Sequence, residues 1–205
     1  VMNSITVEPE WERVALQFMK EHPEVGVVGL KCLQPEIMGG TIESAGIAID
    51  GWRPVDLQHN HPSHRFTTIY ECEAVQWALA ILRKEAVVGN LPEGIYNPFK
   101  GVDDIDNCFV LRSKGWKVYY CGYGVGYHEA RITRGSNAEV DLNLNKQNLE
   151  TFCKRWRFLD KYLSDTAESN RAKYSESTSD DGGNGHKELV VVKPNRAQRR
   201  ALGRR

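Results

Sequence analysis

The sequence lacks the features that would place it at once in a broad class of proteins. Lys and Arg together number 27, as do Asp and Glu, so no net charge draws the chain toward nucleic acid or an anionic membrane. No apolar run approaches the roughly 18 residues of a membrane-spanning helix, and no signal peptide is visible. The Walker phosphate loop, the GxSxG nucleophile elbow and the GxGxxG dinucleotide motif are absent.

Cysteine is sparse, and its spacing does not suggest a disulfide framework. The chain has five cysteines and no CxxC pair: Cys32, Cys72, Cys108, Cys121 and Cys153. Three of them lie in apolar runs, where a thiol behaves as a small hydrophobic group. The odd number and this placement favour a reducing compartment, so we expect a cytoplasmic protein.

The composition divides the chain into an ordered domain and a tail. Apolar residues make up 40% of the sequence and are concentrated in residues 1–164, which can build a normal core. Residues 165–186 are rich in Ser, Asp, Asn and Gly, so we expect disorder there. Residues 187–205 hold seven Lys and Arg against one Glu but no aromatic side chain for base stacking. A solubilising tail is therefore favoured over a nucleic-acid-binding one.

Residue patterns within the ordered domain predict a mixed α/β fold. Strands are expected where apolar and β-branched residues run together, at 25–30, 41–49, 67–83 and 116–128, although ALAIL (78–82) alone could be helical. Helices are expected where apolar residues recur at helical spacing, from Pro9 to about His22, from Asp103 to a cap at Gly115, and from about 144 to 163. The proline-containing stretches 50–66 and 89–102 are expected to be loops.

The segment FKGVDDIDNC (99–108) is the most prominent candidate for chemistry. It places three carboxylates, those of Asp103, Asp104 and Asp106, at a junction between a loop and a helix. Aspartates at this position can simply cap the helix and interact with its dipole. Close carboxylates also raise one another's pKa, which suits a general base near neutral pH. Both interpretations are consistent with the spacing alone.

Histidines and arginines supply further candidates. His128 ends a strand and could bind a divalent metal that also contacts phosphate, although a structural histidine is the commoner case. Arg134 follows in a polar stretch and could face a diphosphate, or belong to a solvated basic loop. His59, His61 and His64 are dense enough for a zinc site to be conceivable, but a surface loop is favoured.

The ordered residues resemble a known family when they are taken in sequence. HPEVGVVGLKCLQPE and TIESAGIAI resemble consecutive segments of family-2, GT-A-type glycosyltransferases. ECEAVQWALAILRKE and FKGVDDIDNCFVLRSKGWKVYY resemble the next two, and GVGYHEA and LETFCKRW resemble the last two. The matches run in order across about residues 1–157. The resemblance implies a GT-A-like mixed sheet flanked by helices, and transfer of a sugar from a nucleotide-sugar donor to a glycan or other hydroxyl acceptor.

The resemblance also implies a role for individual residues. Asp104 matches the catalytic base that deprotonates the acceptor hydroxyl, and Asp103 matches the residue that helps to place the acceptor. Gln76 and Trp77 lie where the family contacts the donor sugar, with Trp77 in place of a glycine. A large indole there would narrow the pocket or stack on a sugar face. His128 matches the histidine that completes the site for a divalent cation, Mn or Mg.

Two departures from the family bear on activity. Ser4 stands where the family has a metal-binding aspartate, and a neutral hydroxyl is a poorer ligand for a hard cation. The resemblance also begins after the family's nucleotide-binding half, so we expect an N-terminally truncated fold. Such a chain could be inactive alone and need a partner subunit that supplies the missing half. The alternative is a non-catalytic remnant that binds glycan or pairs with another subunit.

Overall fold

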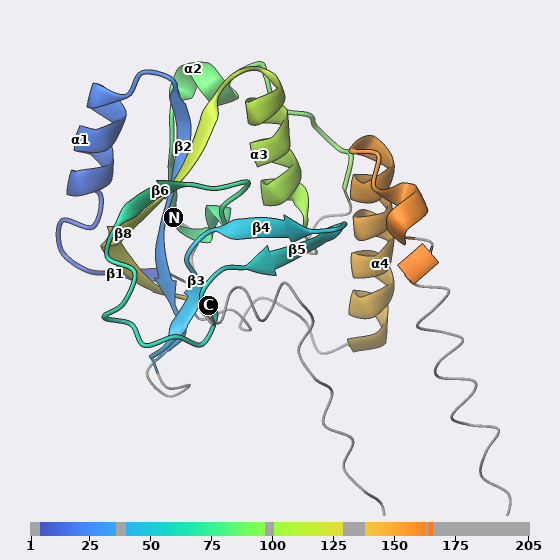
Figure 1. Ribbon diagram of the computed structural model, residues 1–205, viewed down its shortest axis with the longest axis horizontal. Helices are drawn as coiled ribbons and strands as arrows, with labels where there is room; N and C mark the ends of the chain where they lie inside the picture. The colour runs from blue at the N-terminus through green and yellow to red at the C-terminus, as the bar shows by residue number, and fades with distance from the viewer. Residues whose placement is uncertain (1–4, 36–39, 97–100, 129–137, 163, 166–205) are drawn as a thin grey trace, which may run out of the picture.

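The computed structural model describes residues 5–35, 40–96, 101–128, 138–162 and 164–165. Ser4, Arg134 and residues 166–205, which include nearly all of the expected tail, lie outside the described residues. The described chain is a mixed α/β structure in which helices flank a curled sheet of six strands (Figure 1). A separate two-stranded hairpin lies beside this sheet.

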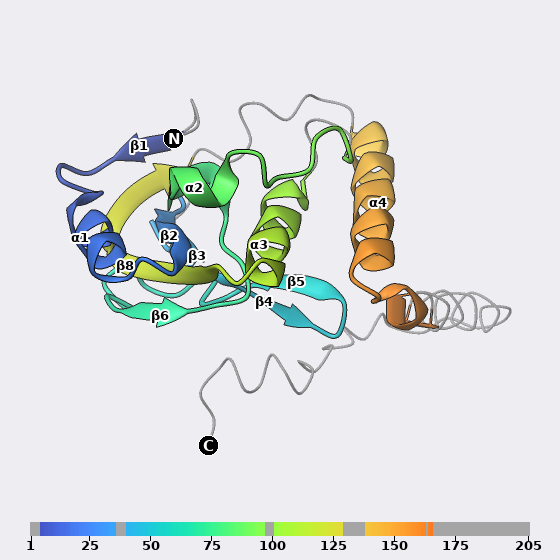
Figure 2. The same cartoon turned by 90° about the horizontal axis from the view of Figure 1, so that it is seen from above.

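Two parallel strands form the centre of the main sheet. β2 (Val25–Leu33) is buried along its whole length, as a continuous apolar strand covered on both faces should be, and it pairs with β8 (Lys117–His128). The sheet order is β1 (Ile5–Val7), β8, β2, β3 (Ile42–Ser44). β8 is long and curved (Figure 2), so one part pairs with β6 (Ile69–Glu71) and its end pairs with β1.

Helices cover both faces of this sheet. α1 (Arg13–Glu21) packs Ala15 and Met19 against Val28 and other residues of β2 and β8. α3 (Asp103–Ser113) lies on the opposite face and shares its core with Val118 of β8. α4 (Ala138–Arg155) packs outside α3 (Figure 1), where the Phe109 and Phe152 rings are 5.5 Å apart. The first residues of α3 therefore lie close to the sheet.

Several predicted elements are confirmed with small differences. α1 ends at Glu21, one residue before His22-Pro23 as expected, although it begins at Arg13 rather than near Pro9. α3 and β8 occupy the predicted positions. The predicted strand 41–49 is divided at Gly46, whose φ of 92° turns the chain between β3 and β4 (Ile47–Asp50).

The prediction that 50–66 is entirely loop was wrong. β5 (Arg53–Asp56) lies within it and forms an antiparallel hairpin with β4. Pro54 suggested a break, but β5 pairs with β4 on one side, and an edge strand tolerates proline because its outer N–H is not needed. This hairpin brings Asp56 back toward the sheet.

The predicted strand 67–83 is three short elements rather than one. β6 pairs with β8, while β7 (Ala80–Leu82) pairs with β2, so the chain crosses between two strands within this segment. A single 3-10 turn, η2 (Trp77–Leu79), precedes β7, and the short α2 (Lys84–Val87) follows it. Val75 packs on Gly29 of β2, where an added Cβ would lie 2.4 Å from the valine Cβ. This contact sets how closely residues 74–77 approach the sheet.

The predicted C-terminal helix, from about 144 to 163, begins earlier than expected and is divided by a turn, because residues 159–162 are helical again. α4 stops at Arg155, and Arg157 adopts a left-handed φ of 61°. The Phe158 N–H then bonds to the Cys153 carbonyl at 2.8 Å, which is the pattern of a Schellman cap. The chain turns after α4, and the Trp52 indole donates to Asp165 at 2.9 Å.

Candidate functional site

Asp104 lies in the first turn of α3, and its carboxylate is directed toward Trp77, in the segment that joins β6 to β7. Oδ1 accepts the Ile105 N–H at 2.8 Å, and Oδ2 accepts the Trp77 N–H at 3.3 Å. One bond is local to the first turn of α3 and is not a helix cap, because the N-cap residue is Val102 and it makes no side-chain hydrogen bond. The other comes from a segment 27 residues away. The carboxylate therefore joins two parts of the fold.

The surroundings of Asp104 make it an unusually weak acid. Burial raises its pKa from 3.8 to about 6, and the charge of Asp103 adds to this effect. The two backbone N–H groups act in the opposite direction because they stabilise the carboxylate. Asp103 itself is exposed. Asp104 is thus ionised at neutral pH but basic enough to accept a proton.

Trp77 lies beside Asp104, and Gln76 directly precedes it in the chain. The Trp77 indole N–H donates to the Cys108 sulfur at 3.3 Å, so part of this ring packs on α3. The Gln76 amide donates to Asp56 Oδ1 at 3.0 Å. Both side chains are partly buried. Whether the indole contacts a sugar stays a prediction.

Asp56 is a site residue that the sequence did not reveal. It comes from β5, inside the stretch predicted to be loop. Burial raises its pKa, and the negative charge of Glu43 adds to the rise, while hydrogen bonds from Ser44 and Gln76 oppose it. The charge of Asp56 in turn helps to raise the pKa of Asp104. The charge of Asp56 therefore interacts with both the Asp104 carboxylate and the Glu43 carboxylate.

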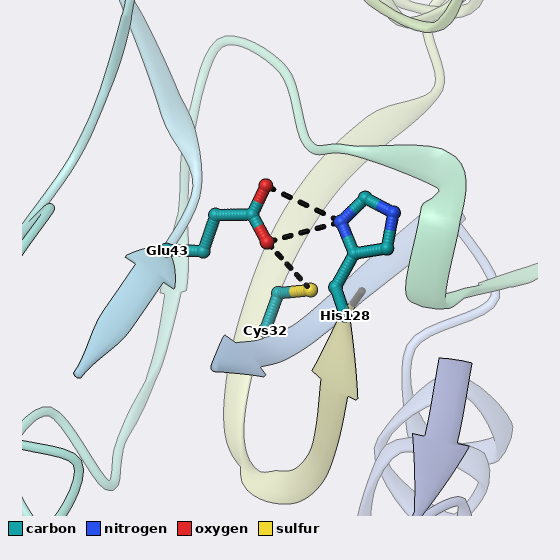
Figure 3. Close-up of side chains that lie close together, drawn as sticks. All are labelled: Cys32, Glu43 and His128. Atoms are coloured by element: carbon teal, nitrogen blue, oxygen red, sulfur yellow. Dashed lines mark hydrogen bonds and ion pairs between the residues drawn. The ribbon is translucent and has the colours of Figure 1, made fainter. Parts of the chain in front are cut away.

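A second cluster joins Cys32, Glu43 and His128 (Figure 3). His128 Nδ1 lies 3.0 Å and 3.2 Å from the two carboxylate oxygens of Glu43. The Cys32 thiol donates to Glu43 Oε2 at 3.8 Å. Burial, together with the Glu43 charge, raises the pKa of the Cys32 thiol, so it is protonated in this arrangement. The three candidate ligand atoms lie within 4.8 Å of one another.

The sheet explains how three distant residues meet. β8, β2 and β3 are neighbours, and each supplies one side chain. Cys32 pairs with Ser44 and Leu33 pairs with Ile42, so Glu43 is the extra residue of a β-bulge. A bulge redirects a side chain that regular pairing would send elsewhere, and Glu43 points to Cys32 and His128. No one-dimensional pattern marks such a bulge, so the sequence did not indicate that Cys32 and Glu43 meet His128.

The loop histidines do not assemble into a metal site in the part of the chain that the structure describes. His59 Nδ1 lies 2.7 Å from the Glu43 carbonyl oxygen, while His61 packs its ring against Phe66 at 5.4 Å. The residues placed to hold a metal among those described are Cys32, Glu43 and His128. His128 was the member of this cluster that the sequence indicated as a candidate metal ligand, and among the loop histidines His59 lies close to Glu43.

The third carboxylate of the FKGVDDIDNC segment has a structural position. Asp106 is fully buried, and its Oδ1 pairs with Arg155 Nε at 3.0 Å and accepts the Trp156 indole N–H at 2.5 Å. These contacts hold the end of α4 against α3. Asp106 thus differs in role from Asp103 and Asp104, and this explains why three acids fit at one helix terminus.

Comparison with known proteins finds no family model and no curated protein that matches the chain. The glycosyltransferase resemblance therefore stays a prediction that depends on the residues themselves. Within the described residues, every helix is too short or too polar to cross a membrane.

Proposed function

We propose that this chain is a GT-A-like glycosyltransferase domain that transfers a sugar from a nucleotide-sugar donor to a hydroxyl acceptor. The observation that carries the proposal is the Asp104 carboxylate, with its raised pKa, hydrogen-bonded to Trp77 and next to Gln76. The resemblance assigns the base and the sugar contacts to these two segments, which are 27 residues apart. Their proximity is what such a reaction requires.

Asp104 would act as the general base. The acceptor oxygen attacks the anomeric carbon while its proton passes to Asp104, and the bond from that carbon to the diphosphate oxygen breaks. A carboxylate with a pKa of about 6 is largely ionised at neutral pH and accepts a proton more readily than an ordinary aspartate. The exposed Asp103 would accept hydrogen bonds from acceptor hydroxyls. Gln76 and Trp77 would contact the donor sugar.

The expected hard cation, Mn or Mg, does not match the donor atoms beside His128. Mg²⁺ prefers carboxylate, carbonyl and water oxygens, but the described cluster has one carboxylate, one imidazole and one thiol. Neutralisation of the leaving diphosphate would fall instead to a basic side chain, for which Arg134 is the candidate that the sequence offers.

The test is Asp104→Asn in the full chain. Release of nucleoside diphosphate is measured with a panel of nucleotide-sugars and a mixture of hydroxyl acceptors. Loss of the base should lower kcat by about 100-fold or more while leaving the fold intact by circular dichroism. Asp160→Asn is the matched control, because this carboxylate is exposed and lies outside the site. Equal turnover in wild type and Asp104→Asn would refute the assignment.

A non-catalytic, subunit-pairing role is the second candidate, and one surface feature favours it. A groove of about 650 Å³ runs along α1, with Val14, Leu16, Phe18 and Ile69 among its lining residues. Leu16 is 42% exposed and adds a large apolar side chain to this surface. Calorimetric titration with nucleotide-sugars separates the two candidates, since micromolar binding by this chain alone argues against a remnant.

A further inference from the structure

We propose that Cys32, Glu43 and His128 form a binding site for a thiophilic divalent cation of the zinc class. The inference is independent of glycosyl transfer, because it concerns donor atoms at the end of three strands and not Asp104. The three side chains converge from β2, β3 and β8 (Figure 3).

The geometry is close to what a tetrahedral ion requires. With ordinary zinc bond lengths, nitrogen and oxygen ligands lie about 3.3 Å apart, and sulfur lies about 3.6 Å from either. In this cluster the nitrogen-to-oxygen distance is 3.0 Å and the sulfur-to-oxygen distance is 3.8 Å. All three atoms lie within 4.8 Å of one another, so side-chain movements of about 1 Å would let one ion contact all three.

The donor types select the class of metal. One thiolate, one imidazole and one carboxylate are ligands of Zn²⁺ and chemically similar ions, whereas Mg²⁺ and Ca²⁺ take oxygen ligands. Binding would release the thiol proton of Cys32 to solvent, since the thiolate is the ligand. Three protein ligands leave a fourth position for water or another small ligand, as in sites that are not purely structural.

The surroundings allow an ion to enter and to stay. The side chains of Glu43 and His128 are 16% and 13% exposed, while Cys32 is almost fully buried. The ion would approach past the first two residues and meet the sulfur at the inner end. The negative charges of Glu43 and the nearby Asp56 attract a cation to this edge of the sheet.

The test uses the full chain, freed of metal by a chelator, and the metals alone as probes. Co²⁺ is titrated and followed by absorption, because sulfur ligation produces a near-ultraviolet charge-transfer band and tetrahedral geometry produces intense visible bands. Zn²⁺ is then titrated in competition, with Mg²⁺ in excess as a second competitor. We expect one equivalent of Co²⁺ to give both signals, Zn²⁺ to displace it, and Mg²⁺ to leave it in place.

Variants identify the ligands. Cys32→Ser should abolish the sulfur band, and His128→Ala should weaken Zn²⁺ binding at least about 100-fold, since even an outer-shell contact is worth about 10- to 100-fold. Cys153→Ser is the matched control, because it makes the same change at another buried thiol and should leave the spectrum unaltered. Thermal unfolding of each apo variant shows that it is folded. An unchanged sulfur band in Cys32→Ser, or displacement of Co²⁺ by Mg²⁺, would overturn the proposal.

Discussion

At the scale of the residue, the most informative group is a carboxylate kept in an unfavourable environment. The pKa of Asp104 is raised to about 6 in the folded chain, against an ordinary value of 3.8. The folded state therefore binds a proton more tightly than the unfolded state, and its stability falls as pH rises between these two values. An ionised carboxylate in this buried position lowers the stability of the fold at neutral pH. Groups with pKa values perturbed in this way are typical of functional sites.

This gives a pH-dependent prediction. Asp104→Asn removes the charge, which should raise the free energy of unfolding at pH 7 by up to about 3 kcal/mol, less the pH-independent cost of losing one of the two acceptor oxygens. At pH 4 the gain should nearly vanish, because wild-type Asp104 is then protonated when folded. Urea unfolding at pH 4, 5, 6 and 7 measures the difference. A gain that is the same at every pH would show that charge is not its cause.

Asp103 supplies a second residue-scale prediction. Its charge contributes to the raised pKa of Asp104. Asp103→Asn should therefore lower the pKa of Asp104 and shift the acidic limb of any pH–rate profile to lower pH. The measurement is kcat/KM against pH for wild type and Asp103→Asn. An unshifted limb would mean that Asp104 is not the group whose ionisation the profile reports.

At the scale of the element, α4 is fastened to α3 by one buried acid. Asp106→Ala would remove the buried carboxylate that the partly exposed Arg155 and the Trp156 indole share, and the loss of such a hydrogen-bonded partner costs about 1–3 kcal/mol. Glu150→Gln is the contrasting variant, because its pair with Lys154 lies at the surface and should change stability by about 0.5 kcal/mol or less. Urea unfolding of both variants checks the contrast, and similar losses would contradict it.

The position of residues 74–77, where the chain passes from β6 to β7, depends on the close contact between Gly29 and Val75. Gly29→Ala would place a Cβ against Val75 and should cost about 1–3 kcal/mol through overpacking. Because Val75 directly precedes Gln76 and Trp77, the same change should displace both from Asp104. A double-mutant cycle with Val75→Gly measures the coupling by urea unfolding. Strictly additive losses would show that the two positions do not press on each other.

At the scale of the whole molecule, the sheet and its helices enclose all five thiols. Each cysteine is free and buried, and burial raises the pKa of Cys72 and Cys108 to about 12. Thiolates react and thiols do not, so the folded chain should resist a thiol reagent at pH 8. We expect five thiols to react in denaturant and none to react rapidly in buffer. A fast-reacting thiol in the folded chain would contradict the packing described for it.

Where local pattern decides structure, the sequence was a good guide. The apolar runs of β2 and β8, the helical spacing of α3 and the end of α1 before Pro23 all follow from short-range chemistry. The DDID cluster likewise identified a helix terminus rich in acids. The roles given to Asp104, Gln76 and Trp77 came from the resemblance, and these residues do lie together in the fold.

Only the tertiary structure decided which residues contact the candidate site residues. The sequence by itself determined the class of fold, the position of α3 and the candidacy of Asp104 and His128. It did not reveal Asp56, whose strand exists because it can pair with β4, or Glu43, which a bulge turns toward His128. Nor did it separate Asp106 from its neighbours, since burial against Arg155 depends on where α4 packs. Pairing, bulges and burial join residues far apart in the chain, and no local pattern encodes them.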